Sequence, residues 1–299
     1  LATSSPRDQA WLTNMQNKVM VSPKMWGVEE RLADMDRAGV DMQVLTVSAP
    51  NAYFDDRETS KALAQSTNEV LAGLCKKYPQ RFKALASVPM LNTEDAIAEL
   101  RRAIHQLGMH GVILGSNIRG RPLNSPEFLP FYEEADKMGL AIFIHPMSPM
   151  GSESLNEYDL VATVGFLMET TVAATRMVYS GIFEQCQNLR LILPHLGGVI
   201  PYIISRIDDS HRTRPECRLH ISKPPSNYLK QFYLDTVCFH LPALQCGLDT
   251  FGSDKMVLGS DYPFALGSID KSVECIKALG LSAEEEEKVF SGNLAKLLK

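Results

Sequence analysis

The sequence has no apolar run of the roughly 18 residues that a membrane-spanning helix needs, and it has no dense stripe of basic residues. Its 299 residues carry a net charge of −5, so nucleic acid is not expected as its main partner. Its six cysteines are scattered without a Cys-x-x-Cys pair, which excludes the common zinc-finger spacings and favours reduced thiols. The opening residues lack the features of a signal peptide. We therefore expect a cytoplasmic protein that binds neither membrane nor nucleic acid.

From residue 40 onward, short apolar runs alternate with longer amphipathic stretches. The expected strands are Val40–Val47, Phe82–Val88, Gly111–Leu114, Leu140–His145, Leu191–Pro194, Phe232–Thr236 and Met256–Gly259. The expected helices are Arg57–Lys77, Thr93–Leu107, Pro126–Met138, Val161–Cys186, Val199–Ser210, Leu241–Phe251 and Ser268–Ala278, followed by two short C-terminal helices. Because each buried strand is followed by a helix, the pattern predicts an α/β fold with a parallel sheet.

One further helix, Val28–Ala38, precedes the first of these strands and stops at Gly39. A closed parallel barrel needs eight strands, each followed by a helix, and only seven are found. We therefore expect a (β/α)8 TIM barrel, one domain over residues 1–299, whose first strand is absent from the sequence given. An open, doubly wound sheet is the alternative. It is disfavoured because no Gly-x-Gly-x-x-Gly fingerprint follows an early strand.

Polar residues end three of the otherwise apolar strands. His145 closes Ala-Ile-Phe-Ile-His, His195 follows Leu-Ile-Leu-Pro, and Asp261 follows Val-Leu-Gly-Ser. In a parallel barrel the groups that carry the chemistry lie at the carboxyl ends of the strands. One such histidine alone would more often be structural, but three residues at equivalent positions indicate a site. Two imidazoles and a carboxylate suit a cation such as Zn²⁺ or Mn²⁺.

Four segments make the resemblance to a known family specific. They are Phe-Ile-His-Pro (143–146), Glu-Thr-Thr-Val-Ala-Ala-Thr-Arg-Met (169–177), Pro-His-Leu-Gly-Gly-Val-Ile-Pro-Tyr (194–202) and Gly-Ser-Asp-Tyr-Pro-Phe (259–264). In this order the chain resembles the amidohydrolase superfamily from about residue 28 to its end. More narrowly, it is similar to the branch that contains aminocarboxymuconate-semialdehyde, resorcylate and dihydroxybenzoate decarboxylases.

The resemblance implies roles for individual residues. His145 matches a metal ligand, Asp261 matches a carboxylate ligand that can also transfer protons, and His195 matches an acid/base histidine near the metal. Arg206 matches an arginine that binds a substrate carboxylate in a neighbouring subunit, which implies a homodimer; its alternative is a surface or helix-packing role. His240 follows the seventh strand closely enough for us to expect contact with substrate.

The sequence also departs from the family pattern. The family's first strand ends in a His-x-His pair that supplies two metal ligands, and no such pair occurs in this sequence. That strand is the one missing from the count, so we expect it upstream of Leu1.

The leading hypothesis is metal-dependent, non-oxidative decarboxylation of a small aromatic or muconate-like carboxylic acid, with Zn²⁺ favoured and Mn²⁺ or Mg²⁺ possible. Hydrolysis or hydration of a lactone, amide, C–C bond or double bond at the same site is the alternative. A barrel without catalytic activity, acting as a scaffold, is a rival of another class.

Overall fold

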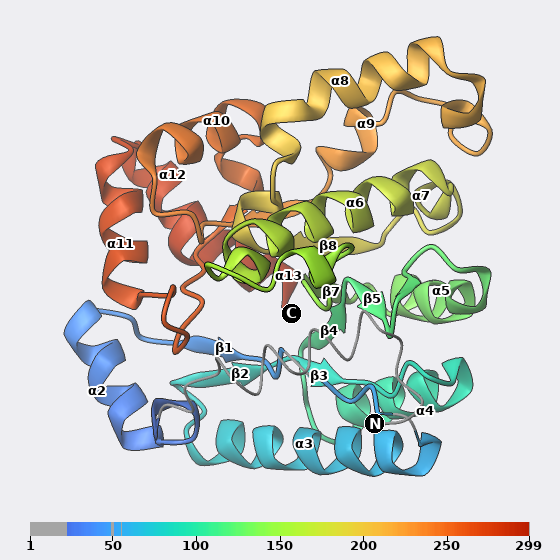
Figure 1. The fold of residues 1–299 in the computed structure, drawn as a ribbon. Helices are drawn as coiled ribbons and strands as arrows, with labels where there is room; N and C mark the ends of the chain where they lie inside the picture. Colours follow the sequence, from blue (N-terminus) through green and yellow to red (C-terminus); the bar gives the residue numbers. More distant parts are fainter. Residues whose placement is uncertain (1–22, 49–50, 55, 299) are drawn as a thin grey trace.

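The protein's structure, a computed structural model, describes residues 23–48, 51–54 and 56–298. Its strands lie at the centre and its helices surround them (Figure 1). The strands of the main sheet are parallel and run in the order β10-β9-β8-β7-β4-β3, and β1 pairs in parallel with β2. Their bounds are β1 (Gln43–Leu45), β2 (Phe82–Ala84), β3 (Ala86–Ser87), β4 (Gly111–Gly115), β7 (Ala141–His145), β8 (Arg190–Leu193), β9 (Tyr233–Asp235) and β10 (Met256–Val257).

β2 and β3 are two halves of one strand, separated at Leu85, whose N–H donates to the carbonyl oxygen of Leu45 at 3.0 Å. The described residues therefore provide seven strand positions in the order β1, β2/β3, β4, β7, β8, β9, β10. Two short strands outside this series, β5 (Asn117–Ile118) and β6 (Arg121–Pro122), form an antiparallel ribbon.

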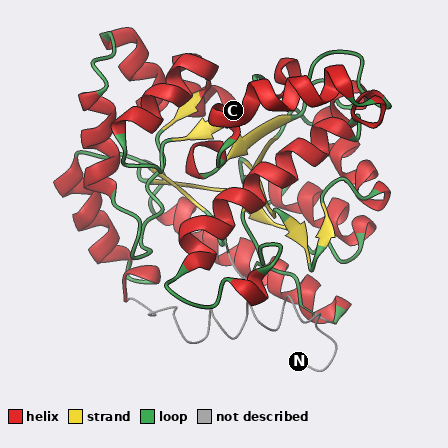
Figure 2. Ribbon diagram, turned by 45° about the horizontal axis from the view of Figure 1, so that its top comes forward, coloured by secondary structure: helices red, strands yellow, loops and turns green. Residues whose placement is uncertain are grey.

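Helices surround the strands (Figure 2) and alternate with them along the chain. They are α2 (Val28–Ala38), α3 (Arg57–Lys77), α4 (Thr93–His105), α5 (Leu129–Lys137), α6 (Phe166–Tyr179), α7 (Ile182–Gln185), α8 (Ile200–Thr213), α9 (Ser226–Leu229), α10 (Leu241–Phe251), α11 (Ile269–Ala278), α12 (Ala283–Glu287) and α13 (Asn293–Leu297). Among the described residues, none of these helices combines the length and the apolar character needed to cross a bilayer.

Local sequence fixes several helix ends. Asp56 caps α3 by accepting the N–H of Thr59, Asn92 caps α4 through Asp95, and Ser268 caps α11 through Lys271. These side chains satisfy backbone donors that the first turn of a helix leaves free. α2 ends at Gly39, whose φ of 68° is a left-handed conformation that glycine adopts without strain.

The expected helix Val161–Cys186 is divided in the structure. A π turn covers Val161–Gly165, α6 follows it, and α7 is separate. The break falls at Gly181, where φ is 77° and an added Cβ would lie 2.5 Å from the carbonyl oxygen of His220. The chain there passes too close to a distant loop for a regular helix to continue.

The strands divide the core into an inner and an outer layer. On β7, Ala141 and Phe143 pack in an inner cluster, whereas Ile142 and Ile144 pack in the large outer cluster beneath the helices. The inner cluster consists of Val44, Leu85, Ile113, Ala141, Phe143, Ile192, Tyr233, Val257, Leu294, Leu297 and Leu298. Its last three members come from the C-terminus, where Leu298 also accepts a hydrogen bond from Lys83. The C-terminal helix therefore covers the amino ends of the strands, and their carboxyl ends are left for a site.

Seven parallel strands with an inner apolar layer and outer helices form a (β/α)8 TIM barrel in which one strand position lies outside the described residues. Within the described ranges, β1 and β10 pair with one neighbour each and not with each other. The eighth position falls between them. The strand expected there, upstream of Leu1, stays a prediction.

Candidate active site

A cavity lies at the carboxyl ends of the strands and is lined also by residues of β10 and β1. His145, His195 and Asp261 all line it. They come from the end of β7, the turn after β8 and the loop after β10, respectively. The structure therefore brings together the three strand-end residues that the sequence singles out.

His145 occupies the last inward-facing position of β7, two residues after Phe143. Its Nδ1 lies 3.0 Å from the carbonyl oxygen of Pro146. A carbonyl can only accept, so Nδ1 carries the proton and Nε2 of the neutral ring keeps a lone pair. Burial, with a smaller contribution from nearby His195, lowers the pKa of His145 to about 3. A neutral imidazole with a free Nε2 is a form that binds a divalent cation.

His195 stands on a tight turn that follows β8. Its ring centroid lies 6.1 Å from that of His145, and burial lowers the pKa of His195 to about 4. Within the described part of the chain, its Nδ1 has no hydrogen-bond partner. The cavity is thus lined by a second neutral imidazole, one that has an unused polar atom.

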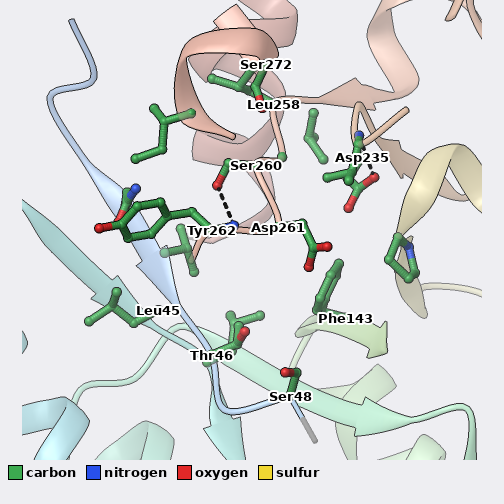
Figure 3. Close-up of a pocket in the computed structure, with 18 of the residues that line it drawn as sticks. Leu45, Thr46, Ser48, Phe143, Asp235, Leu258, Ser260, Asp261, Tyr262 and Ser272 are labelled. Carbon is green, nitrogen blue, oxygen red and sulfur yellow. Dashed lines mark hydrogen bonds between the residues drawn. The ribbon is translucent and has the colours of Figure 1, made fainter. Parts of the chain in front are cut away.

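Two carboxyl groups point into the same cavity, those of Asp235 and Asp261 (Figure 3). Burial raises the pKa of Asp261 to about 6. Burial also raises the pKa of Asp235 to about 7, with a further contribution from the neighbouring Asp261. In the metal-free protein both carboxyls therefore titrate well above the usual range for aspartate.

Asp235 was not among the residues predicted from the sequence. The predicted strand Phe232–Thr236 places it inside the strand, whereas β9 ends at Asp235. The signal that identifies His145, a polar residue at the end of an apolar strand, applies equally to Asp235 once that boundary is known.

The remaining two predicted site residues lie outside the cavity lining. His240 is exposed and precedes the first residue of α10. Arg206 is exposed on α8. Within one chain neither residue is part of the cavity, and their substrate-binding roles stay predictions.

The loop after His145 is anchored by Glu169, a buried residue of α6. Its carboxylate accepts hydrogen bonds from the Asn117 side chain at 2.7 Å and from the Met150 N–H at 3.0 Å. It also accepts one from the Ser116 hydroxyl at 3.2 Å, and that hydroxyl oxygen in turn accepts the N–H of Met147. Glu169 thus fixes the loop that directly follows His145.

The donor atoms around the cavity suit a divalent cation in type, because His145 offers an imidazole nitrogen and Asp261 offers carboxylate oxygens. Among the described residues, however, no three His, Cys, Asp or Glu side chains gather closely enough to hold an ion. His145 and Asp261 therefore stay predicted ligands. The expected His-x-His pair does not occur in the given sequence and also stays a prediction.

Residues 9–299 of the chain match the amidohydrolase family model. The chain belongs to this family. A 2-amino-3-carboxymuconate-6-semialdehyde decarboxylase from Dictyostelium discoideum is 34% identical over 282 residues, which cover 93% of this chain and 78% of that relative. A gamma-resorcylate decarboxylase from Rhizobium sp. is 30% identical over 293 residues, which cover 91% of this chain and 86% of that relative.

A solved structure resembles this amidohydrolase along nearly its whole length. It is the dihydroxybenzoic acid decarboxylase of Polaromonas sp. JS666 with bound manganese and the inhibitor 2-nitroresorcinol. The TM-score is 0.86 at 25% identity, and the match covers 99% of this chain and 94% of that one. These comparisons confirm the family resemblance and the TIM-barrel fold predicted from the sequence.

The turn that carries His195 gives a stability prediction for this amidohydrolase. Gly198 has a φ of 67°, and an added Cβ would clash with the carbonyl oxygen of Leu167 and the hydroxyl of Thr171. We expect Gly198→Ala to lower the free energy of unfolding by about 3 kcal/mol or more, because strain and overlap act together. The control is Gly280→Ala, at a φ of 68° with nothing within 4 Å of its Cβ, which should cost about 1 kcal/mol. Urea unfolding measures both, and equal losses would contradict the prediction.

The neutral His195 ring gives a pH prediction for the metal-free protein. Its pKa is about 4 when folded against 6.5 as the ordinary value, so the unfolded chain binds the proton more readily as the pH falls. Above pH 6.5 the ring is neutral in both the folded and the unfolded chain, so its ionisation does not affect stability. As the pH falls from 6.5 toward 4, protonation of the unfolded chain lowers the free energy of unfolding. Between pH 7 and pH 5, wild type should lose about 1 to 2 kcal/mol more than His195→Asn.

The control is His220→Asn, at an exposed histidine, which should keep the wild-type pH dependence. Chemical unfolding at each pH measures the difference. Parallel curves for wild type and His195→Asn would show that the ring is not held neutral by burial.

Proposed function

We propose that this amidohydrolase is a metal-dependent, non-oxidative decarboxylase of a small aromatic or muconate-like carboxylic acid. The observation that carries the proposal is the gathering of His145, His195 and Asp261 around one cavity at the carboxyl ends of the barrel strands. The names of the two curated relatives, both decarboxylases, support this reaction class over a scaffold role.

The chemistry requires a proton at the carbon that bears the carboxylate. His195 or Asp261, in its protonated form, delivers that proton and is left as the neutral imidazole or the carboxylate, and a new C–H bond forms with an electron pair from the ring or double bond. The C–C bond to the carboxylate then breaks, its electron pair restores the unsaturated system, and CO₂ leaves. A positioned acid of this kind contributes about 10²–10⁴-fold to the rate.

We propose Zn²⁺ as the native ion, with Mn²⁺ and Mg²⁺ as alternatives, held by His145, Asp261 and ligands from outside the described residues. A bound divalent cation would attract the acid's oxygen atoms and offset negative charge that develops during the reaction. The manganese in the Polaromonas enzyme supports a divalent ion in this family without deciding which one.

The reaction is tested by supplying the metal-free protein with Zn²⁺, Mn²⁺ or Mg²⁺ and a panel of hydroxybenzoic and muconic acids. We expect CO₂ release from at least one acid and loss of release when the metal is removed. His195→Ala should lower kcat by about 10²–10⁴-fold, and Asp261→Asn should lower both kcat and the bound metal per protein.

His105→Ala, an exposed position on α4, is the control and should retain wild-type turnover. Full turnover by His195→Ala would defeat the acid/base assignment. Hydrolysis or hydration without CO₂ release from the same panel, extended to lactones and amides, would replace decarboxylation with the alternative activity.

We further propose that the protein is a homodimer in which Arg206 binds the carboxylate of an acid held in the partner's cavity. The exposed position of Arg206 on α8 supports this, as does the side chain of Tyr202 one turn earlier, which is 87% exposed. An arginine fork pairs with a carboxylate through two parallel hydrogen bonds.

Mixed dimers test this proposal. Arg206→Ala and His195→Ala proteins should each be nearly inactive at low acid concentration, yet mixing and refolding them together should restore about a quarter of the wild-type sites. The reason is that half of randomly formed dimers would pair the two variants, and each such dimer contains one intact site. Arg212→Ala, on the same exposed stretch of α8, is the control for Arg206. An active monomer in sedimentation, or no recovery on mixing, would contradict the shared site.

We also propose a cytoplasmic location. All six cysteines are free, which fits a reducing compartment.

A further inference from the structure

The turn after β8 has an unusual backbone. His195, Leu196, Gly197 and Gly198 are four consecutive residues with positive φ, of 53°, 57°, 71° and 67°. For the two residues that carry a side chain, this conformation costs about 1–2 kcal/mol each. Such a turn persists only where surrounding contacts fix it, so something must hold His195 in place.

The contacts that hold the turn come from β9, the neighbouring strand. Asp235 ends that strand, and its Oδ1 accepts the N–H of Leu196 at 3.3 Å and the N–H of Val237 at 3.0 Å. The backbone N–H of His195 also acts to lower the pKa of this carboxyl, against the larger effect of burial. One buried side chain therefore satisfies backbone donors of the strained turn and of its own strand end.

Asp235 is itself fixed on its other side. An added Cβ at Gly259 would lie 2.8 Å from the Cβ of Asp235, so the start of the Asp261 loop packs directly against it. Leu234 packs against the turn in the same way, since an added Cβ at Gly197 would lie 2.8 Å from its Cδ2. The Asp235 carboxyl thus has little freedom to move away from the turn.

We propose that Asp235 is a positioning residue that holds the His195 imidazole in the cavity by accepting the backbone N–H of Leu196, the next residue of the turn. This proposal rests on the proposed role of His195 in proton transfer. In this role Asp235 acts as a hydrogen-bond acceptor, and its negative charge is not required, although its carboxyl group also lines the cavity.

The difference between acceptor and charge makes the proposal testable by substitution. Asp235→Asn keeps an Oδ1 acceptor of the same shape, whereas Asp235→Ala removes it. We expect Asp235→Ala to lower kcat about 10²-fold through misplacement of the imidazole, with KM changed by less than about threefold. Asp235→Asn should restore kcat to within about fivefold of wild type. An Asn variant as slow as the Ala variant would overturn the proposal, because the charge itself would then be required.

A double-mutant cycle tests whether Asp235 acts through His195. In the His195→Ala background, removing the Asp235 side chain should lower kcat by less than about twofold further. An undiminished loss in that background would show that Asp235 acts independently of His195, and the proposal would be wrong.

Amide hydrogen exchange gives a readout that needs no turnover. In the metal-free protein, the Leu196 amide should exchange at least about tenfold faster in Asp235→Ala than in wild type and near the wild-type rate in Asp235→Asn. Thr236→Ala is the control, because the Thr236 hydroxyl accepts the N–H of Gly259 and not a donor of the turn; it should leave Leu196 protected. Unchanged protection in a folded Asp235→Ala protein would overturn the proposal.

If Asp235→Ala does not fold, the Asn variant decides alone: a protected Leu196 amide supports the positioning role, and a fast one overturns it. Failure of wild type to decarboxylate any acid would count against the proposed function and leave this exchange result standing.

Discussion

The alternation of side chains along parallel strands constrains everything else in this protein. Every second residue of a strand must face the interior, and the interior is filled by apolar side chains up to the carboxyl ends. On β7 the inward series is Ala141, Phe143 and His145, and on β9 it is Tyr233 and Asp235. The inward-facing residue nearest the carboxyl end of each strand lies beyond the apolar layer. A polar group placed there reaches the cavity from a rigid strand, and groups from neighbouring strands converge because the strands are parallel.

This convergence has an electrostatic consequence. The pKa values of about 3 for His145, 4 for His195, 6 for Asp261 and 7 for Asp235 all reflect burial that disfavours the charged form. In the metal-free site both imidazoles are therefore neutral near pH 7, whereas the two carboxyls lose their protons only near pH 6 to 7. Each pKa unit of displacement is a difference of about 1.4 kcal/mol between the two protonation states of a group. A bound cation would favour the ionised form of the carboxyls and keep the imidazoles neutral. Burial disfavours uncompensated carboxylates in the metal-free protein, so it would favour the binding of a cation that compensates their charge.

Features set by neighbouring residues could be predicted from the sequence. The helix Arg57–Lys77 and the helix Val28–Ala38 have the predicted bounds, because Asp56 caps the first and Gly39 ends the second. The three strand-end residues were found by the same local reasoning. The break at Gly181 and the end of β9 at Asp235 could not be predicted, since each depends on a chain segment distant in sequence. Arg206 was singled out only through resemblance, and its role stays a prediction, because nothing in an exposed helix position shows what it binds.

The side chains that hold the site in place could not be predicted from the sequence either, because they are distant in sequence from the residues they support. Each of the three strand-end residues stands on, or directly before, a loop anchored by a buried carboxylate from another element: Glu169 for His145, Asp235 for His195 and, through the Tyr262 hydroxyl at 2.7 Å, Asp34 for Asp261. A carboxylate has lone pairs for several donors, so one side chain can fix a loop at two or three points. Those hydrogen bonds offset the desolvation cost of burying it. The anchors are spaced 24, 40 and 227 positions from the residues they support, and only the folded barrel makes them neighbours.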